Sequence, residues 1–147
     1  MLESDIEIYY FSEDRDVPNI TSKTSIWLLE IAGNYGFKIE CINYIFCSDD
    51  YILDINKTYL QHDYYTDIIT FDNSEEQGHI ESDIFISVDR VLENEQTLDV
   101  PRGTEILRVM AHGLLHLCGL KDKSSEEALL MREAEEKCLL LWKTKFI

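Results

Sequence analysis

The sequence predicts an α/β protein of the α+β type, in which a mixed sheet of about four strands packs with five to six helices. Two observations support this fold class. Short segments rich in β-branched and aromatic residues alternate with longer segments whose apolar residues recur at helical spacing. The last third shows only the helical pattern, so the expected order is β-α-β-α-β-β-α-α-α. No repeat or linker interrupts residues 1–147, and we expect a single domain.

The four expected strands are short runs of residues that favour extended backbone. In the second run Ile39 and Cys41 alternate with Glu40, which is typical of a strand with one polar face. A polar loop over residues 72–78 separates the third run from the fourth. The expected strands cover residues 6–11, 38–47, 67–71 and 79–88.

The expected helices carry recognisable signals at their ends. These signals are Gly33 and Gly36 after the first helix, Ser48 or Asp49 before the second, Pro101 in the first turn of the fourth, and the capping box of Ser124 and Glu127 before the last. The expected helices cover residues 25–35, 49–60, about 89–97, 101 to about 118, and the segment after 124. We expect the apolar face of the last helix to consist of Leu129, Leu130, Ala134, Cys138 and Leu141.

The composition is that of a globular protein, with 45% apolar and 29% charged residues. No apolar run approaches the roughly 20 residues that a membrane span needs. The acidic residues 1–5 differ from the basic start of a secretory signal, and the four cysteines form no C-x-x-C pair. We therefore expect a cytoplasmic protein with reduced thiols and no membrane partner.

The charge distribution bears on nucleic-acid binding. The net charge of -16 counts against a partner rich in phosphate. The acidic excess is uneven, because residues 1–100 hold 22 acidic and 5 basic residues, whereas residues 101–147 hold 7 acidic and 8 basic residues. The net charge therefore does not exclude RNA binding by residues 101–147.

Two histidines four residues apart predict a metal site on a central helix. His112 and His116 share one helix face, so both imidazoles can point to one spot. Gly119 can end the helix in a left-handed conformation and turn Asp122 back towards them. This spacing matches an extended zinc motif, with Asp122 in place of the third histidine. We expect His112, His116 and Asp122 to hold one Zn²⁺ per chain and to leave a fourth position open for catalysis.

The residue after the first histidine argues against peptidase chemistry. A metalloprotease of the H-E-x-x-H type carries its general base there, and this chain has Gly113. A peptidase would need a carboxylate base from elsewhere in the fold.

The same residues resemble the YbeY family of bacterial rRNA maturation factors. The family signature H-G-x-L-H-L-x-G-Y-D-H is similar to residues 112–122, a second family block resembles residues 56–71, and a third resembles residues 82–87. Three departures stand out. Leu120 and Lys121 occupy the places of the family's tyrosine and aspartate after Gly119. Asp122 occupies the place of the last family histidine, and Leu60 occupies the place of an arginine implicated in the family's function.

The resemblance implies a single metal-dependent hydrolase domain over residues 1–147. Its expected activity is that of a zinc-dependent, single-strand-specific endoribonuclease in ribosome quality control and in maturation of the 3′ end of small-subunit 16S rRNA. The partners it implies are rRNA, the small ribosomal subunit and ribosomal proteins, with no DNA.

The resemblance leaves the catalytic group and the RNA contacts open. Because Leu60 cannot supply a cation, we expect Lys57, Arg108 or Lys121 to contact RNA. Asp67 and Asp83 are candidates to orient a ligand or to act as the base, since both belong to expected strands or their ends.

A second function stays open beside the nuclease. The missing arginine and the metal charge lowered by Asp122 would also suit a non-catalytic ribosome assembly factor with a structural metal. A metalloprotease is the third and least supported alternative.

Overall fold

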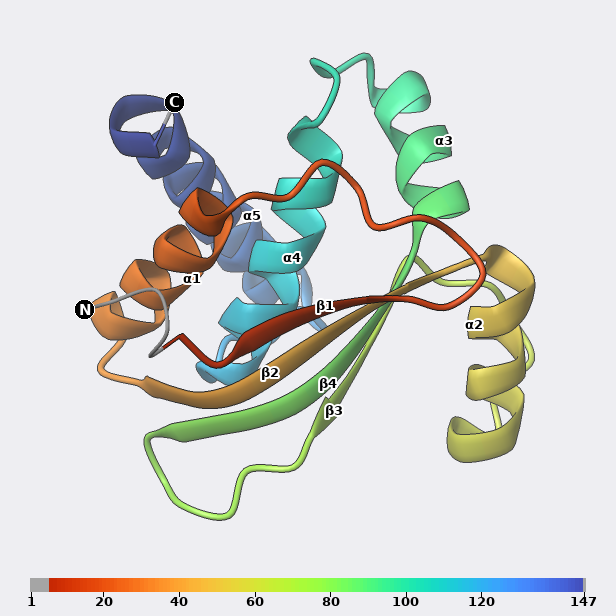
Figure 1. Cartoon of the computed structure of the whole chain (residues 1–147), viewed down its shortest axis with the longest axis horizontal. Coiled ribbons are helices and arrows are strands. Elements are labelled where there is room, and N and C mark those ends of the chain that lie inside the picture. The colour runs from red at the N-terminus through yellow and green to blue at the C-terminus, as the bar shows by residue number, and fades with distance from the viewer. Residues whose placement is uncertain (1–5, 147) are drawn as a thin grey trace.

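The computed structural model describes residues 6–146 and contains, over that range, one four-stranded sheet and five α-helices (Figure 1). Residues 1–5, which underlie the prediction about a secretory signal, lie outside the described residues. The elements are β1 (Ile8–Ser12), α1 (Ser22–Asn34), β2 (Lys38–Cys47), α2 (Asp49–Ile55) continued by the π-helical turn η2 (Asn56–Leu60), β3 (Ile68–Asp72), β4 (His79–Ser87), α3 (Val88–Leu98), α4 (Thr104–Leu117), α5 (Ser125–Leu141) and the π-helical turn η3 (Trp142–Phe146).

The sheet is mixed, which confirms the predicted fold class. Its strand order is β1-β2-β4-β3, with β1, β2 and β4 parallel and the edge strand β3 antiparallel to β4. The predicted strand boundaries agree with the structure to within two residues at each end.

The main core lies between one face of the sheet and helices α1, α4 and α5, which gather on one side of the strands in Figure 1. Two buried polar side chains connect its layers. The Trp27 indole Nε1–H donates to the Cys138 carbonyl oxygen at 2.9 Å, and the Tyr44 hydroxyl donates to the Met110 carbonyl oxygen at 3.2 Å. These bonds satisfy groups that would be costly to bury unpaired.

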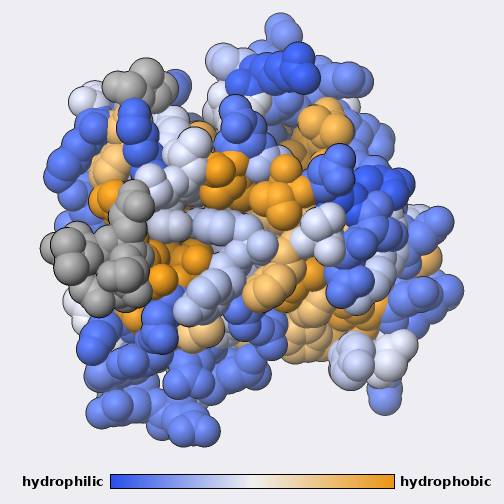
Figure 2. Space-filling view, viewed as in Figure 1, coloured by the Kyte–Doolittle hydropathy of each residue, from blue (hydrophilic) through white to orange (hydrophobic). Residues whose placement is uncertain are grey.

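The opposite face of the sheet is covered only in part. Helix α2 packs there against a small cluster in which Ile52 and Ile55 contact Cys47 and Ile69. Figure 2 shows apolar side chains in a central band of the viewed side, with hydrophilic side chains around them.

The start of α4 differs from the prediction. The helix begins at Thr104, and Pro101 lies in the preceding turn, where its carbonyl oxygen accepts a hydrogen bond from the Thr104 N–H at 3.1 Å. Gly103 has a left-handed backbone with φ of 87°. A residue in that conformation cannot belong to a right-handed helix, so the helix starts after it.

The buried face of α5 also differs. Leu129 and Leu130 are each 60% exposed, so the prediction that they belong to the apolar face is wrong. The buried side chains are Met131, Ala134, Glu135 and Cys138. At about 100° per residue, this set points roughly opposite to Leu129 and about a quarter turn from Leu130. The spacing of apolar residues did not predict this buried face, because Glu135 on it is a carboxylate.

Two further expectations can be compared with the structure. No helix within residues 6–146 has both the length and the apolar character needed to cross a membrane. All four cysteines are free thiols, and three of them, Cys47, Cys118 and Cys138, are buried.

Candidate metal centre

Helix α4 lies close to the sheet at Gly113. A Cβ atom at this buried position would lie 2.9 Å from Ile68 Cδ1 and 3.3 Å from Thr70 Oγ1, both on β3. Glycine therefore permits the close approach of helix and strand. A glutamate here would point into the sheet, so the structure offers no place for the general base of an H-E-x-x-H peptidase.

His112 and His116 lie together on another face of α4, as their spacing predicts. Their rings are nearly parallel, with an interplanar angle of 7° and centroids 6.5 Å apart. His112 is half-buried, whereas His116 is exposed. The pair thus lies at the border between the core and solvent.

The turn after α4 brings Asp122 to the first histidine. Gly119 has the predicted left-handed conformation, with φ of 102°, and the Leu120 N–H donates to the Leu115 carbonyl oxygen at 3.1 Å. These features reverse the chain directly after the helix. As a result, Asp122 Oδ2 lies 3.3 Å from His112 Nε2.

The other nitrogen of His112 is held by a buried carboxylate on α5. Glu135 Oε2 lies 2.6 Å from His112 Nδ1. The hydrogen bond from Glu135 raises the pKa of His112 against the opposing effect of burial. Burial alone would raise the pKa of Glu135, but hydrogen bonds from His112 and Arg108 outweigh it and lower that pKa. The two groups therefore stabilise each other's charged forms.

Arg108, one of the predicted RNA contacts, is held by the same network. Its Nε and Nη2 donate to the two carboxylate oxygens of Glu105 at 2.7 and 2.6 Å, and its Nη1 donates to Glu135 Oε1 at 2.9 Å. The Arg108 side chain is only 18% exposed. Three of its five N–H donors are therefore bound to buried carboxylates, and the contact of Arg108 with RNA stays a prediction.

Asp67 lies at the edge of this network. Its Oδ2 is 3.9 Å from Arg108 Nη2. Burial raises the pKa of Asp67, although the positive charges of Arg108 and His112 oppose the shift. The predicted role of Asp67 beside the metal therefore has a location in the structure and stays a prediction.

The donor set can be compared with what a metal ion requires. Within residues 6–146, no three His, Cys, Asp or Glu side chains are grouped closely enough to hold a metal ion. The donor chemistry nonetheless fits a divalent cation. When His112 is neutral and donates its Nδ1–H to the ionised Glu135, the lone pair of Nε2 faces the Asp122 carboxylate. His112 Nε2 and Asp122 Oδ2 are then two electron-pair donors 3.3 Å apart, an arrangement that a shared proton or a metal ion would stabilise.

Comparison with known proteins gives the family. The family model described as Endoribonuclease YbeY matches residues 9–143. The chain belongs to the endoribonuclease YbeY family.

Relatives named Endoribonuclease YbeY match almost the whole chain. The protein of Cytophaga hutchinsonii is 50% identical over 138 residues, which cover 92% of this chain and 96% of the relative. That of Phocaeicola vulgatus is 49% identical over 135 residues, which cover 91% of this chain and 97% of the relative. The solution structure of TM1509 from Thermotoga maritima matches with a TM-score of 0.65 and 26% identity, over 95% of this chain and 93% of that one.

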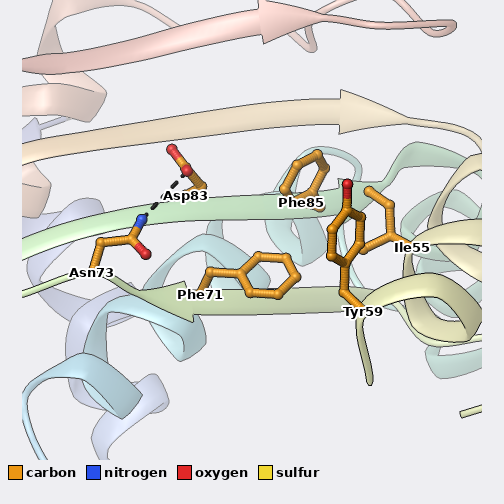
Figure 3. Close-up of a pocket in the computed structure, with 6 residues that line it drawn as sticks. All are labelled: Ile55, Tyr59, Phe71, Asn73, Asp83 and Phe85. Atoms are coloured by element: carbon orange, nitrogen blue, oxygen red, sulfur yellow. Dashed lines mark hydrogen bonds between the residues drawn. The ribbon is translucent and has the colours of Figure 1, made fainter. Parts of the chain in front are cut away.

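Asp83, a predicted residue of the site, lies elsewhere. Asp83 is on the face of the sheet that α2 partly covers, where its carboxylate accepts from the side-chain amides of Asn43 at 3.0 Å and Asn73 at 3.4 Å. Figure 3 shows Asp83 beside a pocket of about 260 Å³ that it lines together with Asn73 and Tyr59, among others. Helix α4 packs on the other face, so the structure does not bring Asp83 to His112.

The two predicted lysines are also separated. Lys57 belongs to η2, where its Nζ lies 3.6 Å from Asp63 Oδ1. Lys121 is exposed in the turn between α4 and α5, next to Asp122 in sequence. Of these two candidates, Lys121 lies nearer in sequence to the predicted ligands, and the contact of either lysine with RNA stays a prediction.

Sequence reasoning missed Glu135, although a signal for it exists. Glu135 follows Ala134 and precedes Cys138 by three residues, so it occupies a core position of an amphipathic helix. A carboxylate at a core position requires a partner. That rule could have directed attention from the final helix to His112 and Arg108.

Proposed function

We propose that this chain is a zinc-dependent endoribonuclease that cleaves single-stranded RNA. One observation carries the metal-dependent part: His112 is held through Nδ1 with its Nε2 facing Asp122 at 3.3 Å. Membership of the endoribonuclease YbeY family supports the RNA substrate.

The site residues have distinct roles in this proposal. His112, His116 and Asp122 would hold one Zn²⁺, and Asp122 would also offset part of its charge. When bound, the ion would supply a Lewis acid for a phosphoryl oxygen. Asp67, whose pKa is raised by burial, is the carboxylate near this site that is suited to exchange a proton.

Solvent access favours catalysis over a structural metal. His116 is exposed, and the Asp122 side chain is 40% exposed. Structural zinc sites are closed by four protein ligands, whereas catalytic sites keep a position open. Two of the three predicted ligands are thus open to solvent, which supports the nuclease over the assembly factor with a structural metal.

The proposed substrate is rRNA of the small ribosomal subunit at its 3′ end, in the cytoplasm. The acidic excess lies in residues 1–100, while residues 101–147 with the predicted ligands are close to neutral. Free RNA would therefore bind weakly and with strong dependence on salt. In this proposal the ribosomal subunit and its proteins deliver the substrate.

Cleavage of an unstructured RNA oligomer tests the proposal. We expect the zinc-loaded protein to cleave the single strand, and we expect a chelator or His116→Ala to abolish cleavage, because each removes the metal. His79→Ala is the matched control, since His79 pairs with Glu40 at the start of β4. Equal cleavage by the untreated, chelated and His116→Ala samples would refute the proposal.

A further inference from the structure

Glu135 is a buried carboxylate whose two oxygens have different partners. Oε2 lies 2.6 Å from His112 Nδ1, and Oε1 accepts from Arg108 Nη1 at 2.9 Å. The side chain is only 4% exposed. Because an ionised carboxylate can only accept hydrogen bonds, the proton in the bond to His112 belongs to Nδ1.

Arg108 prevents this carboxylate from rotating. Its Nε and Nη2 are bound to Glu105, which is 1% exposed, so the planar guanidinium is fixed in the first turns of α4. Its remaining nitrogen, Nη1, holds Glu135 Oε1. Because Arg108 binds Oε1 of Glu135, Oε2 is the oxygen that faces His112.

We infer that Glu135 is a positioning residue, which Arg108 orients and which holds His112 with its proton on Nδ1 and its Nε2 free to face Asp122. This inference rests on the proposed function, since the purpose of that orientation is to present Nε2 to a metal. Glu135 belongs to α5 and His112 to α4, so the packing of these two helices sets the direction of a ligand.

Loss of the carboxylate would remove the preference for one ring nitrogen. Without Glu135 as acceptor, the neutral His112 ring can carry its proton on Nε2 instead, and a protonated nitrogen cannot bind a metal. Carboxylates that hold a metal-binding histidine in this way typically change metal affinity by about 10- to 100-fold. We expect a loss within that range.

Zinc binding by two neighbouring glutamine variants tests the inference. Glu135→Gln keeps the side-chain shape, and Glu136→Gln makes the same charge change at an exposed position of the same helix. We expect Glu135→Gln to bind zinc about 10- to 100-fold more weakly than wild type, and Glu136→Gln to bind as wild type does. Equal zinc affinity of wild type and a folded Glu135→Gln would overturn the inference.

A second measurement needs no variant and therefore does not depend on whether Glu135→Gln folds. In ¹⁵N-histidine-labelled, metal-free wild type, at a pH where imidazoles are neutral, NMR should show the His112 proton on Nδ1. A proton on Nε2 would overturn the inference. A wild type that binds no zinc would instead refute the proposed function, and the NMR result would still decide the role of Glu135.

Discussion

Gly113 belongs to the histidine motif and also determines how closely α4 packs on the sheet. The residue lies between the predicted ligands His112 and His116 in sequence, yet it faces β3 and β4. A side chain at this position would meet Ile68, Thr70 and Ile84, with closest approaches of 2.9 to 3.4 Å for Cβ alone. The motif therefore contains a glycine for packing as well as histidines for chemistry.

This packing predicts the outcome of restoring the H-E-x-x-H pattern. Gly113→Glu should lower the free energy of unfolding by about 3 kcal/mol or more, because it overfills the contact and buries an unpaired carboxylate. Chemical denaturation of metal-free protein measures the change. Gly113→Ala is the graded control and should cost far less, since the nearest atom is the end of an isoleucine side chain. A fully stable Gly113→Glu would contradict the described packing.

Three buried thiols should be unreactive in the native protein. Burial raises the pKa of Cys47 and Cys118 to about 12 and that of Cys138 to about 11. Because the thiolate is the nucleophile, these groups stay protonated at neutral pH. Iodoacetamide followed by mass spectrometry should label at most the half-buried Cys41 natively and all four cysteines in denaturant. Rapid native labelling of Cys118 would contradict this account.

At the scale of elements, the capping box fixes where α5 begins after the turn that carries Asp122. The Glu127 N–H donates to Ser124 Oγ at 3.1 Å, and the Ser124 N–H donates to Glu127 Oε1 at 3.0 Å. The backbone hydrogen bond from Ser124 lowers the pKa of Glu127. The sequence pattern predicted this box correctly because all its partners lie within one helical turn.

Ser124→Ala should destabilise the protein by about 1 kcal/mol, since it leaves a helix N–H without its acceptor. Thermal or chemical denaturation measures the loss. Ser125→Ala, one residue further and exposed, is the control and should have little effect. The cap assignment would be wrong if both substitutions had the same effect.

Local patterns predicted most of the elements, and they failed where contacts between distant segments decide the structure. The order of strands and helices along the chain, the helix ends at Ser48 and Gly119, and the approach of Asp122 to His112 follow from signals close in sequence. The ion pair between Arg108 and Glu135 does not, because Glu135 is 27 residues away on another helix. For the same reason the sequence did not reveal that Arg108, a predicted RNA contact, is bound by a carboxylate of another helix.

At the scale of the whole molecule, the sheet separates two regions of different character. The candidate metal centre lies with α4 and α5 on one face, and Asp83 with its pocket lies on the other. Strand alternation explains the separation, since Asp83 and the buried Ile84 point to opposite faces of β4. The place of Asp83 in a segment that resembles the family did not show that its side chain lies on the face opposite to α4.

Charge is divided along the chain as well. Residues 1–100 carry the acidic excess, and residues 101–147, which contain the candidate site, are close to neutral overall. Repulsion between this excess and RNA phosphates is screened by salt, whereas a metal would act at short range. Tests of cleavage should therefore be run at a fixed ionic strength, so that metal content is the only variable.

A zinc titration of metal-free protein, with cleavage of an unstructured RNA oligomer as the readout, tests the central claim most directly. The account predicts no cleavage without metal, and a rate that rises to a plateau at one zinc per chain. Asp122→Ala should require far more zinc, because it lacks the carboxylate that faces His112 Nε2. Full cleavage by metal-free wild type would contradict the account.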